Sequence, residues 1–256
     1  MAGFSGKGGT LTIIGPGGST VISNELGRWS IGLTNTLVDT TGLGHRIERT
    51  AVGSAAVNLE AERIVDVQSG MRWDATLGAY DGADLESVNV NLSIGEIETG
   101  DVADHIDQRV PDALNGTVEF GTRYAGNQHF CDLVEAAASG AAAINFAVVD
   151  RDGSTVIGGT AVMEAGTHEN PRGANRQTGR AKFLTVTSVK ASYTLLASAK
   201  VTWSSVASQA YVLKDKAGTT VFEGQGFTVG GTLTTGRNTN VRETLRATIH
   251  AIDTLI

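Results

Sequence analysis

The sequence predicts an all-β protein of the β-sandwich or barrel-like class with one short α-helix, and three observations support this. First, the phrase Gly-Ser-Thr-Val-Ile at residues 18–22 returns at 153–157 and, more loosely, as Gly-Thr-Thr-Val-Phe at 218–222. Each copy follows a β-prone run, and its glycine can supply the positive φ of a tight hairpin turn. Second, glycine is abundant (33 of 256 residues) and proline is scarce (3), as in a chain with many reversals. Third, apolar and polar residues alternate along several segments, most clearly over 88–97.

The expected strands follow from this alternation. The first hairpin pairs residues 11–14 with residues 18–22. Further strands are expected at 29–33, 55–67, 71–80, 88–97, 114–123 and 146–149, the last with a hairpin partner after it. The remaining strands are expected at 183–195, in a hairpin region over 200–230, and over 232–256. Two stretches lack periodicity: residues 35–54 are interpreted as a long excursion and residues 164–182 as an irregular loop. Trp29, Trp73 and Trp203 stand near the starts of expected strands and are interpreted as core anchors.

The clearest helix is expected at about residues 128–138. Phe130, Leu133, Val134 and Ala137 share one face there, and Gly140 follows as a C-cap. We expect this helix to close an open end of a sheet or to pack across one face. The best internal boundary is the segment 198–200, so the chain is divided into a β domain at 1–195 and a C-terminal β extension at 196–256.

The net charge of −7 argues against tight nucleic-acid binding, which requires clustered Lys and Arg. An acidic wall would instead repel phosphates and let nucleic acid pass. Cys131 is the single cysteine, which excludes an intrachain disulfide. The first residues lack the apolar stretch of a signal peptide, and no run reaches the roughly 18 apolar residues of a membrane-spanning helix. We therefore expect folding in a cytoplasm and no membrane partner.

No pattern in the sequence favours an enzyme. Lys7 is followed by glycine, where a phosphate-binding loop requires serine or threonine. The spacing of Asp150 and Asp152 resembles the first two ligand positions of a calcium-binding loop. No acidic residue stands where such a loop would end, so a hairpin turn is the preferred interpretation. The five histidines are scattered. The carboxylates over 96–107 are interpreted as a solvated acidic loop, with a cation site or an acid/base pair as the alternative. We expect no catalytic residue, no metal and no cofactor.

Three arginines recur at intervals of four within the irregular stretch 164–182: Arg172, Arg176 and Arg180. Neighbouring glycines and Pro171 favour a loop over a helix. Two interpretations stay open. The arginines form either a solvated loop or an interface arm that contacts the acidic residues 96–107 of a neighbouring subunit.

The order of these features resembles the phage tail-tube (major tail) protein family, which is similar in fold to the type VI secretion tube protein. A glycine-rich start leads to a hairpin and to the strand at 29–33, which begins with Trp29 and ends with Leu33. A Thr/Gly-rich stretch at 39–42, the segment 114–120, the helix at 128–138 and the hairpin after 143–146 follow. The resemblance covers roughly residues 5–195.

The resemblance implies a virion structural protein without enzymatic activity. Protomers would join sheet edge to sheet edge into rings, commonly hexameric, and the rings would stack into a hollow tail tube that conducts DNA into the host. The partners would be further copies of the chain and other tail proteins, with only non-specific contact to transiting DNA. The location would be the virion tail, assembled in the host cytoplasm.

In such proteins the loop after the early strands reaches the adjacent ring, which here corresponds to residues 35–54. Its interface candidates are Asp39, Thr40, Arg46, Glu48 and Arg49. The alternative function is a capsid decoration or surface-binding β module that recognises protein or carbohydrate. Paired exposed aromatic residues on one face would favour that alternative.

Overall fold

The computed structural model describes residues 9–23, 25–41, 50–65, 74–78, 80–81, 85–100, 105–122, 143–150, 152–169, 176–236 and 239–256. Its strands are β1 (Thr10–Gly15), β2 (Gly18–Ser23), β3 (Leu26–Asp39), β4 (Thr50–Val65), β5 (Asp74–Leu77), β6 (Tyr80–Asp81), β7 (Leu85–Glu98), β8 (Arg109–Thr122), β9 (Ile144–Val149), β10 (Thr155–Glu169), β11 (Arg176–Val189), β12 (Gln209–Lys214), β13 (Thr220–Gly236) and β14 (Val241–Leu255). The helix in this part of the chain is α2 (Thr194–Ser205). The all-β class with a short helix is confirmed.

The repeated phrase belongs to a β-hairpin at all three places. Its glycine completes the turn, and the residues after the glycine lead into the second strand of the hairpins β1–β2, β9–β10 and β12–β13. Gly18, Gly153 and Gly218 adopt positive φ values of 119°, 81° and 84°. These glycines provide the left-handed backbone that the reversals require.

The position of α2 corrects the sequence interpretation of residues 190–205. Strand β11 ends at Val189, and the expected boundary at 198–200 lies inside α2. The apolar residues Leu195, Leu196 and Ala199 are fully buried at helical spacing, whereas the expected strand ends at Leu195 and the expected boundary contains Ala199. The expected helix at 128–138 lies outside the described residues. In the sequence, the expected helix precedes β9, and α2 precedes β12.

Both described tryptophans pack against the core as expected, but the expected strand position is wrong for Trp203. Trp29 lies on β3 and packs against one hydrophobic cluster. Trp203 lies in α2 rather than at the start of a strand, and it packs half-buried against the other cluster. Trp73 lies outside the described residues.

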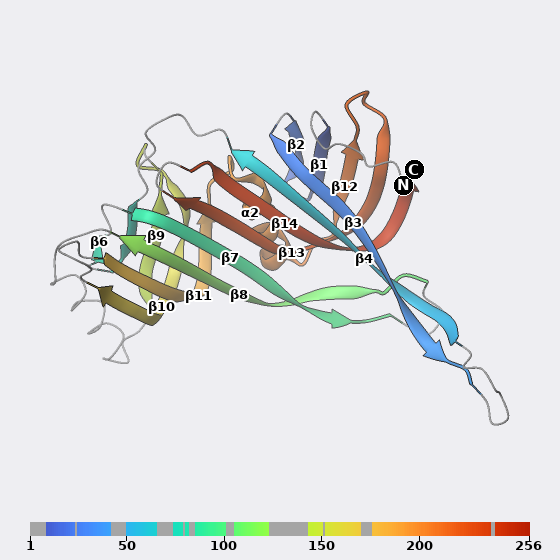
Figure 1. Ribbon diagram of the computed structural model, residues 1–256, viewed down its shortest axis with the longest axis horizontal. Coiled ribbons are helices and arrows are strands. Elements are labelled where there is room, and N and C mark those ends of the chain that lie inside the picture. The colour runs from blue at the N-terminus through green and yellow to red at the C-terminus, as the bar shows by residue number, and fades with distance from the viewer. Residues whose placement is uncertain are drawn as a thin grey trace.

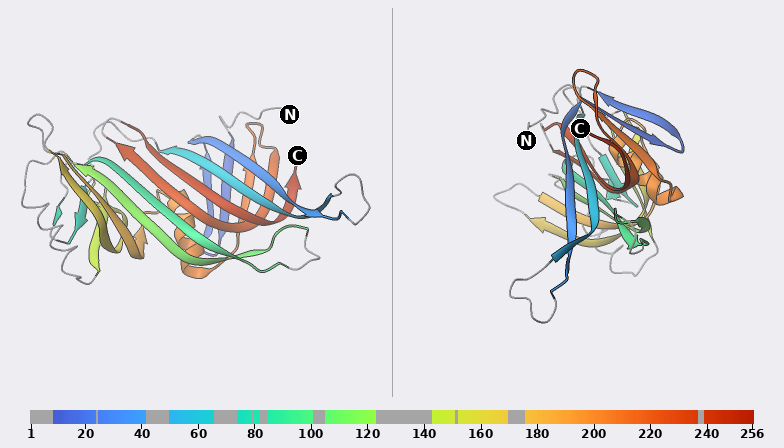
Figure 2. Two further views of the ribbon diagram at one scale, coloured as in Figure 1. Left: turned by 60° about the horizontal axis from the view of Figure 1, so that its bottom comes forward. Right: turned by 90° about the vertical axis from the view of Figure 1, so that its right-hand side faces the viewer.

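The largest layer of the molecule is a strongly twisted antiparallel sheet, which we call the front sheet (Figures 1 and 2). Its order is β3-β4-β14-β13-β7-β8-β11-β10. Behind it, β12, β1 and β2 continue from the first half of β13, and β9, β5 and β6 continue from β10. Helix α2 packs on β13 and β14. It contributes Leu195 to one core cluster and Leu196 to the other.

The two halves of this sheet are built in the same way. We call β1–β4, α2 and β12–β14 unit A, and β5–β11 unit B. Unit A contains the pairs β1–β2, β1–β12, β12–β13, β13–β14, β14–β4 and β3–β4. Unit B repeats them in the same order as β5–β6, β5–β9, β9–β10, β10–β11, β11–β8 and β7–β8. Unit B is thus inserted between β4 and α2 of unit A.

The repeat holds residue by residue. Counterparts lie 59 positions apart in β3 and β7 (26 to 85), 65 apart in β10 and β13 (155 to 220), and 66 apart in β11 and β14 (177 to 243). The pairing irregularities recur at counterpart positions. Those after Gly158, Thr160 and Met163 in β10 match those after Glu223, Gln225 and Thr228 in β13. Those after Leu26 and Asn35 in β3 match those after Leu85 and Ile94 in β7.

Strands from the expected C-terminal extension lie inside the common sheet. β13 pairs with β7, β14 pairs with β4, and β12 pairs with β1. The expected division of the chain at residue 195 therefore does not coincide with a break in the sheet.

Candidate self-assembly interface

The front sheet ends at two long edges. Within the described residues, β3 pairs with β4 alone. At the other end, the pairing of β9 with β10 stops at Ala161, so residues 162–169 of β10 have β11 as their single strand partner in the part of the chain that the structure describes. A strand edge presents unpaired N–H and C=O groups, which favour pairing with another chain.

The β3 edge lacks the usual protection of such edges. Between Arg28 and Asp39 it carries no charged residue and no proline, the features that block edge-to-edge association. Most of the strand is exposed, including the apolar Leu33, at 59%. The edge is therefore suited to being covered by another strand.

The expected excursion at residues 35–54 is wrong for the part that the structure describes. β3 and β4 continue as a paired hairpin, with Asn35 opposite Ala55 and Asp39 opposite Thr50. This arm projects from the body at the lower right of Figure 1. Leu37 and Val38 on it are 64% and 50% exposed. The arm thus presents apolar side chains to solvent.

The interface candidates of the arm are only partly described. Asp39 and Thr40 are exposed at its end. The backbone N–H of Thr41 donates to Asp39 Oδ1 at 2.8 Å, and hydrogen bonding to Thr41 lowers the pKa of Asp39. Arg46, Glu48 and Arg49 lie outside the described residues.

The irregular loop expected at 164–182 is also wrong for its described ends. Residues 164–169 belong to β10 and residues 176–182 to β11, with Glu169 opposite Arg176. Arg180 Nε lies 2.9 Å from Glu164 and 3.7 Å from Glu119, and Arg176 lies 4.0 Å from Glu86. Arg172 lies outside the described residues.

The acidic stretch has a basic partner within the chain. Arg109 lies 3.9 Å from Glu96 and 3.3 Å from Asp107. The structure does not bring Arg176 or Arg180 to these carboxylates, because both arginines are on β11 and contact other acidic residues. Contact between the arginines and a neighbouring subunit stays a prediction.

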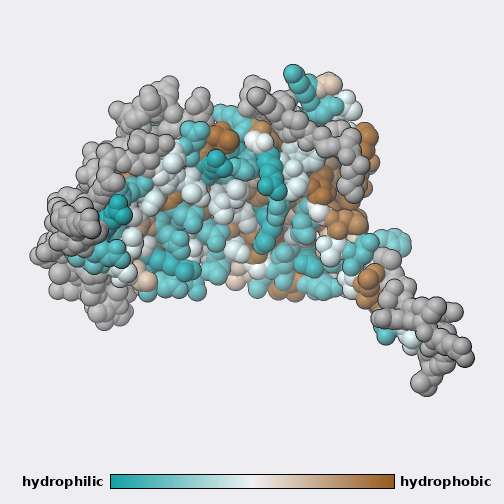
Figure 3. All heavy atoms as spheres, viewed as in Figure 1, coloured by the Kyte–Doolittle hydropathy of each residue, from teal (hydrophilic) through white to brown (hydrophobic). Residues whose placement is uncertain are grey.

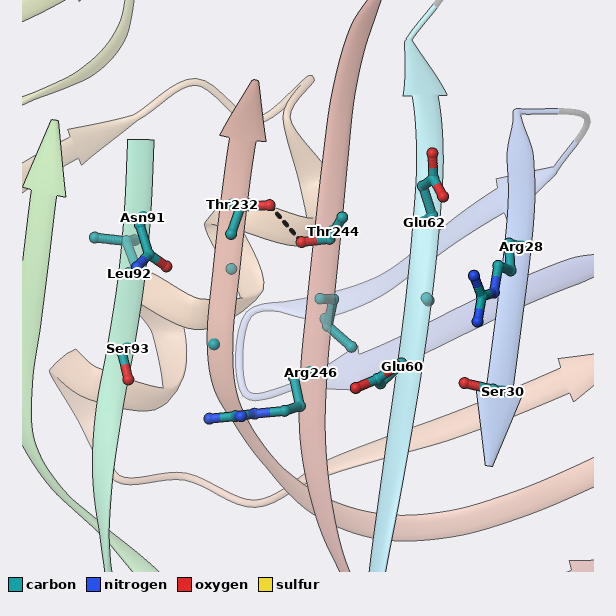
Figure 4. Close-up of a pocket in the computed structure, with 14 residues that line it drawn as sticks. Arg28, Ser30, Glu60, Glu62, Asn91, Leu92, Ser93, Thr232, Thr244 and Arg246 are labelled. Carbon is teal, nitrogen blue, oxygen red and sulfur yellow. Dashed lines mark hydrogen bonds between the residues drawn. The ribbon is translucent and has the colours of Figure 1, made fainter. Parts of the chain in front are cut away.

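The face of the front sheet opposite α2 is polar at its centre (Figure 3). A shallow hollow of about 460 Å³ lies there across β3, β4, β14, β13 and β7. Its rim includes Arg28, Glu60 and Glu62, and Arg246 extends over β13 towards Ser93 (Figure 4). Neighbouring charges alternate on this face, and Arg242 lies 3.1 Å from Glu62. Within the described parts of the chain, no group of three or more His, Cys, Asp or Glu residues could hold a metal ion.

Arg63 holds the base of the β3–β4 edge on the body. Its guanidinium pairs with Glu25, just before β3, and lies 3.0 Å from Glu243 on β14. It also donates to the carbonyl of Ser192, before α2, at 2.6 Å. Burial raises the pKa of Glu243 to about 7, while Arg63 and the N–H of Leu196 act in the opposite direction. Sequence reading missed this cluster, because Arg63 stands in an ordinary alternating strand.

Comparison with known proteins gives no assignment. No family model matches the chain, and no curated protein matches it. In the part of the chain that the structure describes, no helix is long and apolar enough to span a membrane. The resemblance to tail-tube proteins therefore stays a prediction, and the open sheet edges are the structural feature on which a proposal can be built.

Proposed function

We propose that this protein is a virion structural protein that self-assembles into stacked rings forming a hollow tail tube. The observation that carries the proposal is the front sheet of eight antiparallel strands. It ends on one side in β3 and on the other in residues 162–169 of β10, and the outer edges of these two segments have no strand partner among the described residues. A ring closes such edges by pairing each copy with the next.

Two further features support a tube. The β3–β4 arm extends beyond the body and exposes Leu37 and Val38, which suits a contact with another copy. On the polar face opposite α2, two arginines lie close to carboxylates in the pairs Arg180–Glu164 and Arg242–Glu62. Arginines neutralised in this way gain little from contact with phosphates, so such a face is compatible with passage of DNA.

Negative-stain microscopy of the purified protein tests the proposal. We expect rings or tubes with a central hole over a range of salt and protein concentrations. A protein that stays monomeric throughout would contradict the tube and favour the alternative, a surface-binding β module.

A matched pair of variants makes the test specific. Leu33→Lys places a charge on the exposed β3 edge and should abolish the rings, because lysine on an edge blocks pairing. Leu184→Lys changes a similarly exposed leucine, at 51% against 59%, on β11, outside both segments proposed to form the contact. We expect it to assemble like the unchanged protein. Equal assembly of both variants would exclude the β3 edge from the interface.

A further inference from the structure

The chain already contains one example of the contact that ring closure requires. Units A and B join where β13 pairs with β7, with Gly230 opposite Ser93, Thr232 opposite Asn91, and the remaining pairs in step as far as Gly236 and Ser87. β7 is the unit B counterpart of β3, and β13 is the unit A counterpart of β10. The two strands of this internal junction thus correspond to the two open edges of the front sheet.

We infer that β3 of one copy pairs antiparallel with the second half of β10 in the next copy, in the register of the internal β13–β7 junction. This inference rests on the proposed self-assembly and names its partner strands. Shifting the internal register by the repeat distances of 65 and 59 positions gives the expected pairs. They are Ala165 with Thr34, Gly166 with Leu33, Thr167 with Gly32, His168 with Ile31 and Glu169 with Ser30.

The burial of counterpart residues supports this pairing. Leu92 and Val90 of β7 are 1% and 0% exposed at the internal junction. Their counterparts on β3 are Leu33, which is 59% exposed, and Ile31, which is half-buried. Backbone register and strand length are the same, so the difference lies in the surroundings. β7 has β13 beside it and contacts α2, whose Leu196 and Ala199 share a core cluster with Leu92 and Val90. β3 has no strand on that side within the described residues. Pairing with β10 would give β3 the same neighbour.

Strand direction and charge agree with the pairing. The front sheet has eight strands that alternate in direction, so β3 and β10 at its two ends run oppositely. Rotation about a ring axis preserves the sense in which each strand runs along that axis. In a sheet that continues around the ring with its strands inclined to the axis, the new junction is therefore antiparallel like every other pair. Glu169 would lie opposite Ser30 and diagonal to Arg28. Opposite charges at such positions stabilise neighbouring strands.

Disulfide trapping tests the register. In a Cys131→Ser background, we would introduce Gly32→Cys and Thr167→Cys into one chain and oxidise the assembled protein. Asn91→Cys with Thr232→Cys is the matched control, because it is the counterpart pair of the internal junction. We expect the control to form an intrachain disulfide and the test pair to form a ladder of covalent multimers. A mixture of the two single variants should yield dimers, and neither single variant alone should.

The possible failures are distinct. Rings that form without cross-linking of the test pair, while the internal control is oxidised, would overturn the β3–β10 pairing and leave the tube intact. Dimers of the Gly32→Cys variant alone would also overturn it, because they would show two β3 strands meeting each other. Absence of any assembly would overturn the proposed function and this pairing with it.

Discussion

Strands β3 and β7 occupy the same place in units A and B, yet their surroundings differ. Both contain 14 residues and have pairing irregularities at counterpart positions. β7 has neighbours on both sides, β13 and β8. β3 has β4 alone among the described residues. The β7 counterparts of Leu33 and Ile31 are buried core residues, whereas these two lack a neighbouring strand on one side in the part of the chain that the structure describes. This is apparent because the chain contains both units and they can be compared.

A second difference lies at one cross-strand position. Unit A places Arg63 opposite the buried Glu243, whereas unit B places Thr122 opposite Gln177. The fold therefore accepts either an ion pair or two neutral polar residues there. In unit A, Arg63 also binds Glu25 and the carbonyl of Ser192. The ion pair thus anchors the open edge of unit A, and unit B, which is held by β13, lacks it.

The largest expected effect comes from breaking this ion pair. Arg63→Met leaves the Glu243 carboxylate buried without its cation and should lower the free energy of unfolding by about 3–5 kcal/mol at pH 8. Urea unfolding followed by circular dichroism measures this.

The matched control gives unit A the residues of unit B. The double variant Arg63→Thr with Glu243→Gln removes both charges together and should cost only about 1–2 kcal/mol. A double variant as unstable as Arg63→Met would show that the hydrogen bonds of Arg63 to Glu25 and Ser192, rather than the buried charge, dominate.

The next effect is a pH dependence specific to unit A. Because the pKa of Glu243 in the folded protein is raised from 4.5 to about 7, the folded state binds this proton more tightly than the unfolded chain. Its contribution to stability is fully present below pH 4.5 and is lost as the pH rises through 7. The stability of the unchanged protein relative to Glu243→Gln should fall by about 3 kcal/mol over that window. A constant difference would mean that folding does not raise the pKa of Glu243.

The smallest effect tests whether the counterpart turns of the two units are equivalent. Gly153→Ala and Gly218→Ala each place a side chain at positive φ, with no atom within 4 Å of the new Cβ. Each should cost about 1 kcal/mol in thermal unfolding, because the backbone alone is affected. Gly17→Ala, also in open space but without positive φ, should change stability by less than about 0.5 kcal/mol. Unequal costs at Gly153 and Gly218 would show that the two turns differ in strain.

The hairpins could be predicted from the sequence because their signals are local. The turn glycines at 153 and 218, with an aspartate three positions before each, give identical backbone bonding. Asp150 and Asp215 accept from Gly153 and Gly218 at 2.9 and 3.1 Å. These two turns are counterparts in units B and A, so the repeated phrase was a trace of the repeat.

The repeat itself could not be read from the sequence, because its counterparts conserve geometry rather than identity. Trp29 corresponds to Val88, and Arg63 corresponds to Thr122. The pairing order also needs contacts between distant residues, such as β1 with β12, that no local pattern encodes. Helix α2 was missed because no start or stop signal marks it. Tyr193 at its N-cap makes no side-chain capping bond, its first turn has no acidic residue and its last turn has no basic residue. The arm was missed because β3 is exposed on both faces over residues 32–39 and its sequence lacks alternation there.

The two-unit construction changes how a ring of this protein would be counted. In a ring of six four-stranded units, three chains would complete the circle, and the exact symmetry would be threefold beneath an apparent sixfold. Junctions within one chain, between β13 and β7, would then alternate with junctions between two chains, between β10 and β3. Half of the contacts would form during folding of each chain and half only on association, so folding would already have fixed the curvature that assembly extends.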